Sequence, residues 1–420
     1  MAGDDPLILP VRGRAAVIRQ VLQKRLDTVL PLAMREAGFD MWVILCQEDN
    51  SDPVFASMMP LDTWCPILQM LVLFDRGETQ GVERISIAMT NTGGLFAQPW
   101  QGRNHEEQWP LLSRIIEERD PQRIGINIGQ VQWAAGGLTH NLHTQLVQAL
   151  PRKYVERLAS AEPMATRWLA TLTGQEIELY ERAWAVAHRI TAECYSREAI
   201  VPGETTADDL VWHYWQRCVD LGVTPSFRPF FDRVRSDAMK KQFGEDDRAI
   251  RPGDLLHSDC GIQYLRLNTD HQQWAYLLRP GESDAPEGLR RLLAQANRLQ
   301  DIFMAEFREG LTGNELLANI LARARREGVP EPKVYSHSLG LLLHEPGPLI
   351  GLPWEQERCP GRGDVALRPD YAFTMELAVA DAVPEWDGQT VRFSIEEDVV
   401  FTGGRCRLIG GRQTAFYLVG

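Results

Sequence analysis

Two aspartates interrupt the segment HSDCGIQYLRLNTDHQQW, residues 257–274, which otherwise has the pattern of a β-hairpin. We predict its turn near Tyr264 and Leu265. Residues whose numbers have a constant sum then face each other, so Asp259 and Asp270 are predicted to be direct cross-strand neighbours. Like charges in opposite positions destabilise a sheet. The pair therefore requires a shared proton, a basic partner or a metal ion, unless the register slips and exposes both acids.

The length and charge of the chain narrow the expected organisation and partners. Its 420 residues, 44% of them apolar, exceed what one small core needs, so two domains are expected. The net charge of -13 comes without a Lys/Arg tract, which argues against nucleic acid or an anionic membrane as the main partner. No segment approaches the roughly 18 consecutive apolar residues of a membrane span. A small molecule or short peptide is the expected substrate.

The cysteines indicate a reducing compartment. There are 7 of them, an odd number, widely spaced and without a CxxC pair. This pattern favours neither a disulfide framework nor a thiolate zinc site. The start of the chain, MAGDDPLILP, has two acids before a very short apolar run, unlike a secretory signal. We therefore expect a cytoplasmic protein.

Residues 14–160 alternate a long helix-like stretch with short apolar strand-like runs. The helical pattern is AAVIRQVLQKRLDTVLPLAMREAG, and the strand patterns are MWVILC, ILQMLVLF, RISIAMT and RIGINI. Such alternation is typical of an α/β layer domain with a central sheet. The segment DRGETQG, residues 75–81, is predicted to join two neighbouring strands. We predict an α/β N-terminal domain over residues 1–165.

A second domain is predicted over residues 166–420. Its first helix, TGQEIELYERAWAVAHRITAECYSREAI, has Thr173 and Glu176 in the positions of a capping box. A further helix, ADDLVWHYWQRCVDLG, precedes a strand-rich half that begins at about residue 224. Polar residues interrupt the apolar strands of this half, so we expect the chemistry there.

Three further stretches of this half place polar side chains in apolar patterns. YSHSLGLLLHEPGPLIG contains His337 and His344 in a Gly/Pro-rich segment. YAFTMELAVA contains Glu376, and RFSIEEDVVFTGG contains Glu396 next to Glu397. A single glutamate in a strand usually faces solvent, and a single histidine is usually a core or surface residue. Four carboxylates and a histidine together favour one shared site.

The order of these motifs resembles that of the pita-bread metallohydrolases, which include methionine aminopeptidase, Xaa-Pro aminopeptidase, prolidase and creatinase. PGDLLHSDCG and LNTD resemble the two aspartate strands, SHSLGLLLHEPGP the HGxGxxxHExP segment, FTMEL the TxEP strand and IEEDVVFT the RIEDxxxxT strand. The likeness covers about residues 170–410 and extends loosely to the creatinase-type N-terminal domain. It implies an α/β N-terminal domain followed by an α+β pita-bread (creatinase/aminopeptidase-like) catalytic domain.

The resemblance implies a dinuclear metal site. Counting six residues back from Thr402 selects Glu396 rather than Glu397. Four negative carboxylates balance two divalent ions, and one imidazole without a thiolate favours Mn, Co, Fe or a catalytic Zn pair over a structural zinc. Manganese is the metal we expect. The implied ligands are Asp259, Asp270, His337, Glu376 and Glu396.

The resemblance also implies catalytic roles. Two ions about 3.5 to 4 Å apart can bridge and acidify one water and polarise the carbonyl that it attacks. In the family, the counterpart of Glu376 handles the proton of that water, and the counterpart of His344 hydrogen-bonds the substrate or its tetrahedral intermediate. Phe227, in TPSFRPFF, resembles the TSF segment that leads toward the pocket and is a candidate substrate contact.

One histidine of the resembling proteins is missing here. Members that act on peptides or creatine commonly have it some seventeen residues before the first aspartate, where this chain has KKQ, residues 240–242. Lys241 is therefore a candidate substrate contact, although it also fits a solvated loop. Further departures are Ser338, Leu377, Ser394 and Gln273, at positions where Gly, Pro, Arg and Arg are usual. They remove no ligand but predict a different substrate end of the pocket.

The sequence thus predicts a dinuclear metal-dependent hydrolase of amide C–N bonds. The expected enzyme is an Xaa-Pro dipeptidase or aminopeptidase that uses a metal-bridging hydroxide. The missing histidine leaves open a creatinase-like hydrolase or a metal-dependent lyase acting on a small non-peptide metabolite. A non-catalytic binding module that has kept the fold is a third alternative. Similarity to creatinase and prolidase implies a homodimer.

Overall fold

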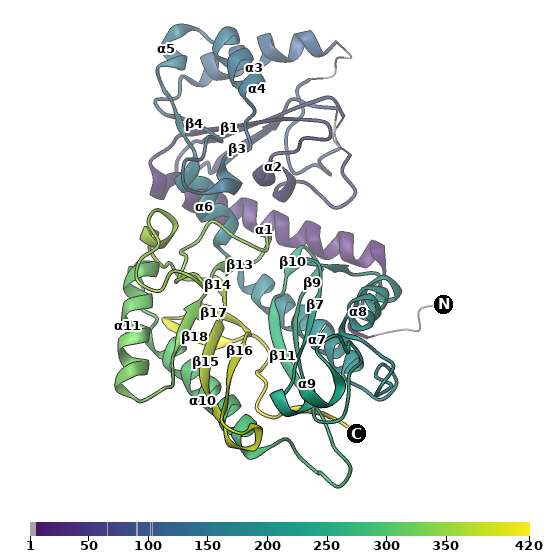
Figure 1. Cartoon of the computed structure of the whole chain (residues 1–420). Helices are drawn as coiled ribbons and strands as arrows, with labels where there is room; N and C mark the ends of the chain where they lie inside the picture. The colour runs from purple at the N-terminus through teal and green to yellow at the C-terminus, as the bar shows by residue number, and fades with distance from the viewer. Residues whose placement is uncertain (1–5, 65, 90, 101, 103) are drawn as a thin grey trace. The chain divides into compact units, whose positions relative to one another are not determined.

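The computed structural model describes residues 6–420 apart from residues 65, 90, 101 and 103. The chain divides between Gln175 and Glu176 into two compact units, and the described residues 6–8 belong with the C-terminal one (Figure 1). The boundary predicted between residues 165 and 166 falls inside helix α6 (Glu162–Ala170). That helix packs against α1 (Val11–Ala37) and so belongs entirely to the N-terminal unit.

The N-terminal unit is built around one sheet in the order β3-β2-β1-β4-β5. The central strand β1 pairs antiparallel with β2 and parallel with β4. Its apolar run is buried because helices cover both faces of the sheet (Figure 1). The predicted α/β layers are confirmed, and DRGETQG joins β2 to β3 as expected. The strands are β1 (Met41–Gln47), β2 (Leu68–Asp75), β3 (Val82–Ser86), β4 (Ile124–Ile126) and β5 (Leu158–Ser160), and the remaining helices are α2 (Pro53–Ser57), η1 (His105–Glu107), α3 (Gln108–Arg119), η2 (Trp133–Ala135), α4 (His140–Ala149) and α5 (Arg152–Val155).

The C-terminal unit contains four mostly antiparallel sheets. Their strand orders are β10-β9-β6, β19-β11-β8-β7, β12-β15-β16 and β13-β14-β17-β18. The strands are β6 (Thr224–Pro225), β7 (Phe230–Val234), β8 (Leu255–Cys260), β9 (Ile262–Tyr264), β10 (Leu267–Asn268), β11 (His271–Leu277), β12 (Lys333–Tyr335), β13 (Ser338–Leu339), β14 (Tyr371–Thr374), β15 (Glu376–Val383), β16 (Gln389–Ile395), β17 (Asp398–Thr402), β18 (Arg405–Leu408) and β19 (Tyr417–Val419). A bridge between Gln272 and Glu396 links the second sheet to the end of the third.

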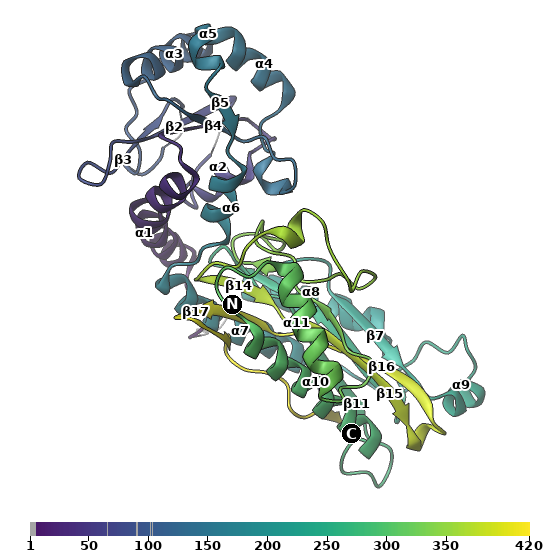
Figure 2. The same cartoon turned by 90° about the vertical axis from the view of Figure 1, so that its left-hand side faces the viewer.

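Helices pack on the outside of these strands (Figure 2). The apolar stripe of α10 packs against β15, β16 and β18, and α11 packs against α10 and β12. Helix α8 covers β7. The helices are α7 (Gly174–Cys194), α8 (Ala207–Leu221), α9 (Asp237–Phe243), α10 (Glu287–Glu306), α11 (Gly313–Arg326), η3 (Arg362–Asp364) and η4 (Pro384–Trp386). The strands are thereby left with one side on which polar side chains can gather.

The hairpin that carries the two aspartates has a different register from the predicted one. Its turn consists of Leu265 and Arg266, whose φ angles of 52° and 69° are those of a type I′ turn. This turn lies one residue later than predicted, so Asp259 pairs with Gln272, and the predicted direct pairing with Asp270 is wrong. The resulting shift of two residues preserves the side-chain alternation, so the aspartates stay on one face as diagonal neighbours.

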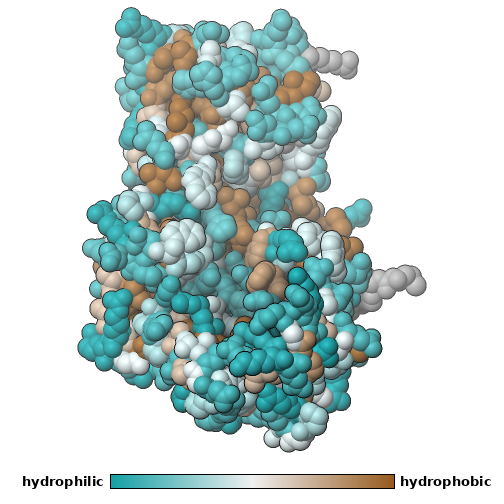
Figure 3. Space-filling model, in the orientation of Figure 1, coloured by the Kyte–Doolittle hydropathy of each residue, from teal (hydrophilic) through white to brown (hydrophobic). Residues whose placement is uncertain are grey.

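Among the helices of the described residues, none combines the length and the apolar character that crossing a membrane requires. The face of the C-terminal unit in Figure 3 is covered mainly by hydrophilic residues, as the net charge of -13 leads one to expect. The cysteines that the structure describes are free thiols, and Cys65 lies outside the described residues.

Candidate metal centre

The five predicted ligands lie at or near the ends of strands that belong to three of the sheets. Asp259 is on β8, and Asp270 directly precedes β11. His337 lies between β12 and β13, Glu376 begins β15, and Glu396 lies between β16 and β17. Such positions let strands of different sheets aim side chains at one point, which a single strand could not do.

Three of these residues form a tight buried group. Asp270, His337 and Glu396 each offer a ligand atom, and these atoms lie within 4.8 Å of one another. His337 Nε2 is 3.9 Å from Asp270 Oδ2, which is too long for a hydrogen bond. The Asp259 and Asp270 carboxyl groups are close enough for each to change the pKa of the other, and Glu376 is close enough to Asp259 for its pKa to respond to that charge. The structure therefore brings all five predicted ligands together.

The four carboxyl groups hold protons that a metal would displace. Burial raises the pKa of Asp259 to about 6. Burial, and then the charge of Asp259, raises the pKa of Glu376 to about 8. Burial raises the pKa of Asp270 and of Glu396 well above their usual range, and in each case the other acids of the group add to the effect. Without cations, burial and mutual repulsion make these acids keep their protons to a higher pH than exposed carboxyl groups do.

Three carboxylate oxygens of the group are buried without a hydrogen-bond partner among the described residues. They are Asp259 Oδ1, Asp270 Oδ1 and Glu396 Oε1. A buried oxygen left unsatisfied costs about 1–3 kcal/mol, so such atoms are rare unless a ligand satisfies them. Oxygen-rich coordination with one imidazole is typical of divalent Mn, Fe, Co or Zn. The residues present therefore fit a pair of divalent ions.

His337 is held in the tautomer that a metal ligand requires. Its Nδ1 lies 3.2 Å from the Ser338 carbonyl oxygen and can donate its proton there, so Nε2 keeps the lone pair on the Asp270 side. Burial, together with the neighbouring His344, lowers the pKa of His337 to about 3, so the imidazole is neutral. Backbone hydrogen bonds to Thr374 fix the position of residue 337.

The adjacent Glu397 has a different environment. Its Oε1 accepts hydrogen bonds from Gln273 Nε2 at 2.7 Å and from the Gln413 backbone N–H at 3.0 Å. Its Oε2 lies 2.9 Å from His188 Nε2. A carboxylate satisfied on both oxygens has no need of a metal, whereas Glu396 Oε1 has no such partner. The geometry therefore favours Glu396 over Glu397 as a ligand.

His344 and Phe227, the predicted substrate contacts, both lie beside the group. The His344 and His337 rings are 4.4 Å apart, and His344 is exposed. Burial of its ring nitrogens, and then the charge of Arg362, lowers the pKa of His344. Phe227 packs against Gly261, where an added Cβ would lie 3.3 Å from the ring. Gly261 follows Asp259 by two residues, so Phe227 lies close to the first aspartate.

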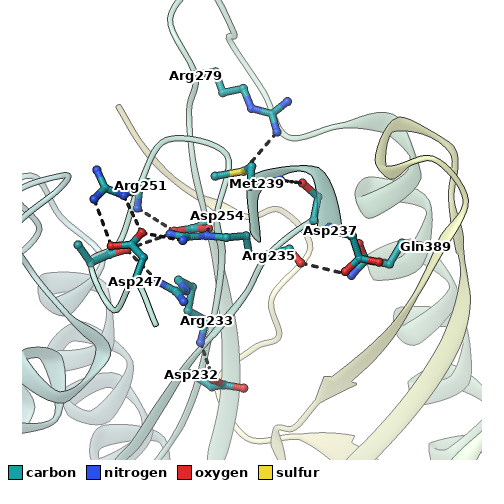
Figure 4. A network of polar contacts seen from close by, with 12 residues as sticks. Asp232, Arg233, Arg235, Asp237, Met239, Asp247, Arg251, Asp254, Arg279 and Gln389 are labelled. Atoms are coloured by element: carbon teal, nitrogen blue, oxygen red, sulfur yellow. Dashed lines mark hydrogen bonds and ion pairs between the residues drawn. The ribbon is translucent and has the colours of Figure 1, made fainter. Parts of the chain in front are cut away.

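Lys241 is the predicted site residue that the structure does not bring to the group. It lies on α9 and lines a cavity of about 840 Å³ together with Asp387 and Gln389. Figure 4 shows the polar contacts of this region, including the hydrogen bond between the Asp237 backbone N–H and Gln389 Oε1, 2.8 Å long. Gln389 and Glu396 mark opposite ends of β16, about 23 Å apart at 3.3 Å per residue. The position of Lys241 therefore does not support a contact with substrate at the carboxylates.

Three further polar residues lie at the group and escaped the sequence interpretation. Gln272 donates to Glu396 at 2.9 Å. Tyr335 pairs with Glu376, and burial followed by the charge of Glu376 raises its pKa. Arg362 lies near enough to His344 to lower its pKa. Gln272 could have been found, because it lies two residues after Asp270 on the same strand face, whereas Arg362 begins η3, a helix of three residues that is too short to show a periodic pattern.

Comparisons with known proteins agree with this geometry. The model of metallopeptidase family M24 matches residues 178–403. The X-Pro aminopeptidase of Thermotoga maritima MSB8 is 15% identical with a TM-score of 0.64, over 92% of this chain and 100% of that chain. An Xaa-Pro dipeptidase from Bacillus anthracis is 15% identical with a TM-score of 0.61, over 94% of this chain and 99% of that chain.

A structure of another kind has the same fold. The N-terminal domain of FACT complex subunit SPT16 from Cicer arietinum is 10% identical with a TM-score of 0.60, over 96% of this chain and 99% of that one. No curated protein matches the chain. At these identities the solved structures show the fold alone, and the predicted pita-bread architecture is confirmed. The family match covers more than half of the residues, and the chain therefore belongs to metallopeptidase family M24.

Proposed function

We propose that this metallopeptidase hydrolyses amide C–N bonds with the help of two divalent metal ions, with Mn²⁺ as the expected metal. The observation that carries the proposal is the buried group of four carboxyls and one neutral imidazole, in which three carboxylate oxygens have no partner among the described residues. The proposed ligands are Asp259, Asp270, His337, Glu376 and Glu396. The family is metal-dependent, which agrees with the group of possible ligands in this chain.

The side chains around the group have complementary tasks in such a reaction. Two ions bound there would lower the pKa of a water and polarise the scissile carbonyl. Glu376, half-buried and ionised once metal has displaced its proton, is suited to accept the proton of the attacking water and pass it to the leaving amine. His344, whose lowered pKa keeps it neutral, is suited to donate an N–H to the oxygen that becomes negative.

Apolar and cationic side chains near the group support an Xaa-Pro substrate. Phe230 pairs with Asp259 across β7 and β8, shares its sheet face and is 47% exposed. With Phe227 it offers an apolar wall for a proline ring. Arg362, near His344, offers a cation for a substrate carboxylate. Structural neighbours described as X-Pro aminopeptidase and Xaa-Pro dipeptidase point to the same class.

Two alternatives predict different substrates or none. The described chain has no histidine between His213 and His257, and Lys241 lies far from the carboxylates, which favours a creatinase-like hydrolase or a lyase for a non-peptide metabolite. The likeness to the SPT16 domain raises a non-catalytic binding module. The complete set of five candidate ligands argues against the latter.

Turnover of a substrate panel tests the proposal. The Mn²⁺-loaded chain is assayed with Xaa-Pro dipeptides, Xaa-Pro-Yaa tripeptides and creatine, beside Asp259→Ala and the exposed control Asp246→Ala. We expect kcat/KM of at least about 10⁴ M⁻¹s⁻¹ for an Xaa-Pro peptide, lost in Asp259→Ala and kept in Asp246→Ala. Turnover of creatine alone would support the metabolite hydrolase instead, and full activity of Asp259→Ala would refute the metal mechanism.

A further inference from the structure

The side chain of Gln272 lies between Glu376, Glu396 and the imidazole of His257. The function proposed above assigns no role to Gln272. It is 2% exposed. Its Nε2 donates to Glu396 Oε2 at 2.9 Å, and its side chain lies close enough to Glu376 to oppose the rise in the pKa of that carboxyl. Its Oε1 is 3.0 Å from His257 Nε2. One amide thus lies beside two proposed metal ligands and a histidine outside the ligand set.

The chemistry of these partners fixes which way the amide points. Once a metal has displaced their protons, the carboxylates only accept hydrogen bonds, and a glutamine NH₂ group can donate two. The NH₂ of Gln272 therefore faces Glu396, and its oxygen faces His257. That oxygen needs a donor, so the His257 proton is assigned to Nε2. The reverse orientation would set the amide oxygen against a carboxylate oxygen.

Aromatic packing holds the histidine that selects this orientation. The His257 ring is 4.5 Å from that of Trp274, its partner in the register of β8 and β11. Trp274 stacks on Phe393 of β16 with ring centroids 4.4 Å apart and planes at 15°. The Gln272 backbone N–H donates to the Glu396 carbonyl at 3.1 Å. Residues of β8, β11 and β16 therefore hold the Gln272 amide in position.

The consequence for Glu396 is specific. Gln272 occupies Oε2, so Oε1 is the oxygen that is buried and without a partner among the described residues. A carboxylate anchored through one oxygen presents the other in a fixed direction, as hydrogen bonds to ligating side chains do in metal sites. The same side chain also lies close to Glu376, so Gln272 stands beside two of the proposed ligands.

We propose that Gln272 is a positioning residue that fixes Glu396 for metal binding, and that His257 orients its amide. The inference rests on the proposed metal site and adds residues that no part of the hydrolytic scheme above requires. The roles of Gln272 and His257 can be tested through metal affinity and coordination geometry.

Metal binding by matched variants tests this inference. Gln272→Met keeps the length of the side chain but loses the donors, and Gln273→Met is the control, because it removes an equally buried amide bonded to Glu397. Dissociation constants for Co²⁺ are measured by calorimetry, and the visible absorption spectrum of the Co²⁺-loaded chain reports coordination geometry. We expect about 10- to 100-fold weaker binding and a changed spectrum for Gln272→Met, with both kept within about threefold of the parent in Gln273→Met.

Variants of His257 keep the test decisive if Gln272→Met does not fold. His257→Phe preserves a ring on Trp274 but loses the N–H, whereas His257→Gln places an amide nitrogen where Nε2 was. We expect weaker Co²⁺ binding in the first and recovery in the second. Unchanged affinity and spectrum in Gln272→Met or His257→Phe, or equal losses in Gln273→Met, would overturn the inference while leaving the metal site standing. Absence of Co²⁺ binding by the unmodified chain would instead refute the proposed function.

Discussion

Two adjacent residues, Glu396 and Glu397, show how environment decides the chemistry of identical side chains. Counting along the chain selected Glu396, and the structure gives the physical reason. Glu397 has donors on both oxygens, whereas Glu396 Oε1 has no partner among the described residues and lies with Asp270 and His337. The sequence could not reveal these donors, because Gln413 and His188 come from distant segments.

This contrast predicts opposite effects for two conservative changes. Glu396→Gln should lower metal content by about one ion per chain and reduce kcat/KM by at least about 100-fold, because it replaces a ligating carboxylate by an amide. Glu397→Gln should keep the metal but lower the free energy of unfolding by about 1–3 kcal/mol, because its NH₂ group would face other donors. Elemental analysis and urea unfolding of both variants check this, and metal loss confined to Glu397→Gln would contradict it.

The hairpin of β8 to β11 shows what element-level reasoning can and cannot predict. Period-two alternation correctly placed Asp259 and Asp270 on one face, and that property survives a shift of two residues. The turn was misplaced by one position, because type I′ turns are usually marked by Asn-Gly, whereas Leu265 and Arg266 occupy this one. The register therefore depends on contacts that no local pattern displays.

Gly261 is one of those contacts, and its replacement should disturb the aspartates. An added Cβ would lie 1.9 Å from the Thr269 carbonyl oxygen, next to Asp270. Gly261→Ala should lower the free energy of unfolding by about 1–3 kcal/mol or more and weaken metal binding, because the backbone must move apart. Gly174→Ala, where an added Cβ meets nothing within 4 Å, is the control and should be neutral or slightly stabilising. Chemical denaturation and metal titration compare the stability and metal affinity of the two variants. Equal values for both would argue against this register.

For the whole molecule, the protonation of the site links stability to pH. The folded pKa values of Asp259, about 6, and Glu376, about 8, lie above their ordinary values of 3.8 and 4.5. The folded, metal-free chain therefore holds more protons than the unfolded chain in this range, so the contribution of these groups is fully present below about pH 4 and is lost as the pH rises through 6 and then 8. A metal replaces the protons and removes this loss.

Mn²⁺ should therefore raise the melting temperature more at about pH 8 than at about pH 5.5. Metal must compete with protons at the lower pH, and each proton released changes the apparent affinity about tenfold per pH unit. Thermal unfolding with Mn²⁺ or with a chelator at both pH values measures the difference, and Asp270→Asn, which lacks one proposed ligand, should show a smaller metal-dependent shift. An equal shift at the two pH values would contradict the linkage.

At this same scale, the order of motifs and the alternation of elements sufficed to predict two units and the pita-bread fold, because both depend on patterns that run along the chain. The unit boundary was placed early because α6 packs on α1, a contact between segments far apart in sequence. Lys241 was placed at the pocket by counting residues, but its helix lies at the far end of β16. The homodimer and the cytoplasmic location stay predictions.

The metal content of the purified chain after equilibrium dialysis against Mn²⁺ at about pH 8 tests the five-residue site most directly. Four carboxylates and a neutral imidazole should hold about two ions per chain, and Asp270→Asn should hold at most about one. A chain that binds no ion under these conditions, or a variant that binds as many ions as the unmodified chain, would contradict a metal centre built from these residues.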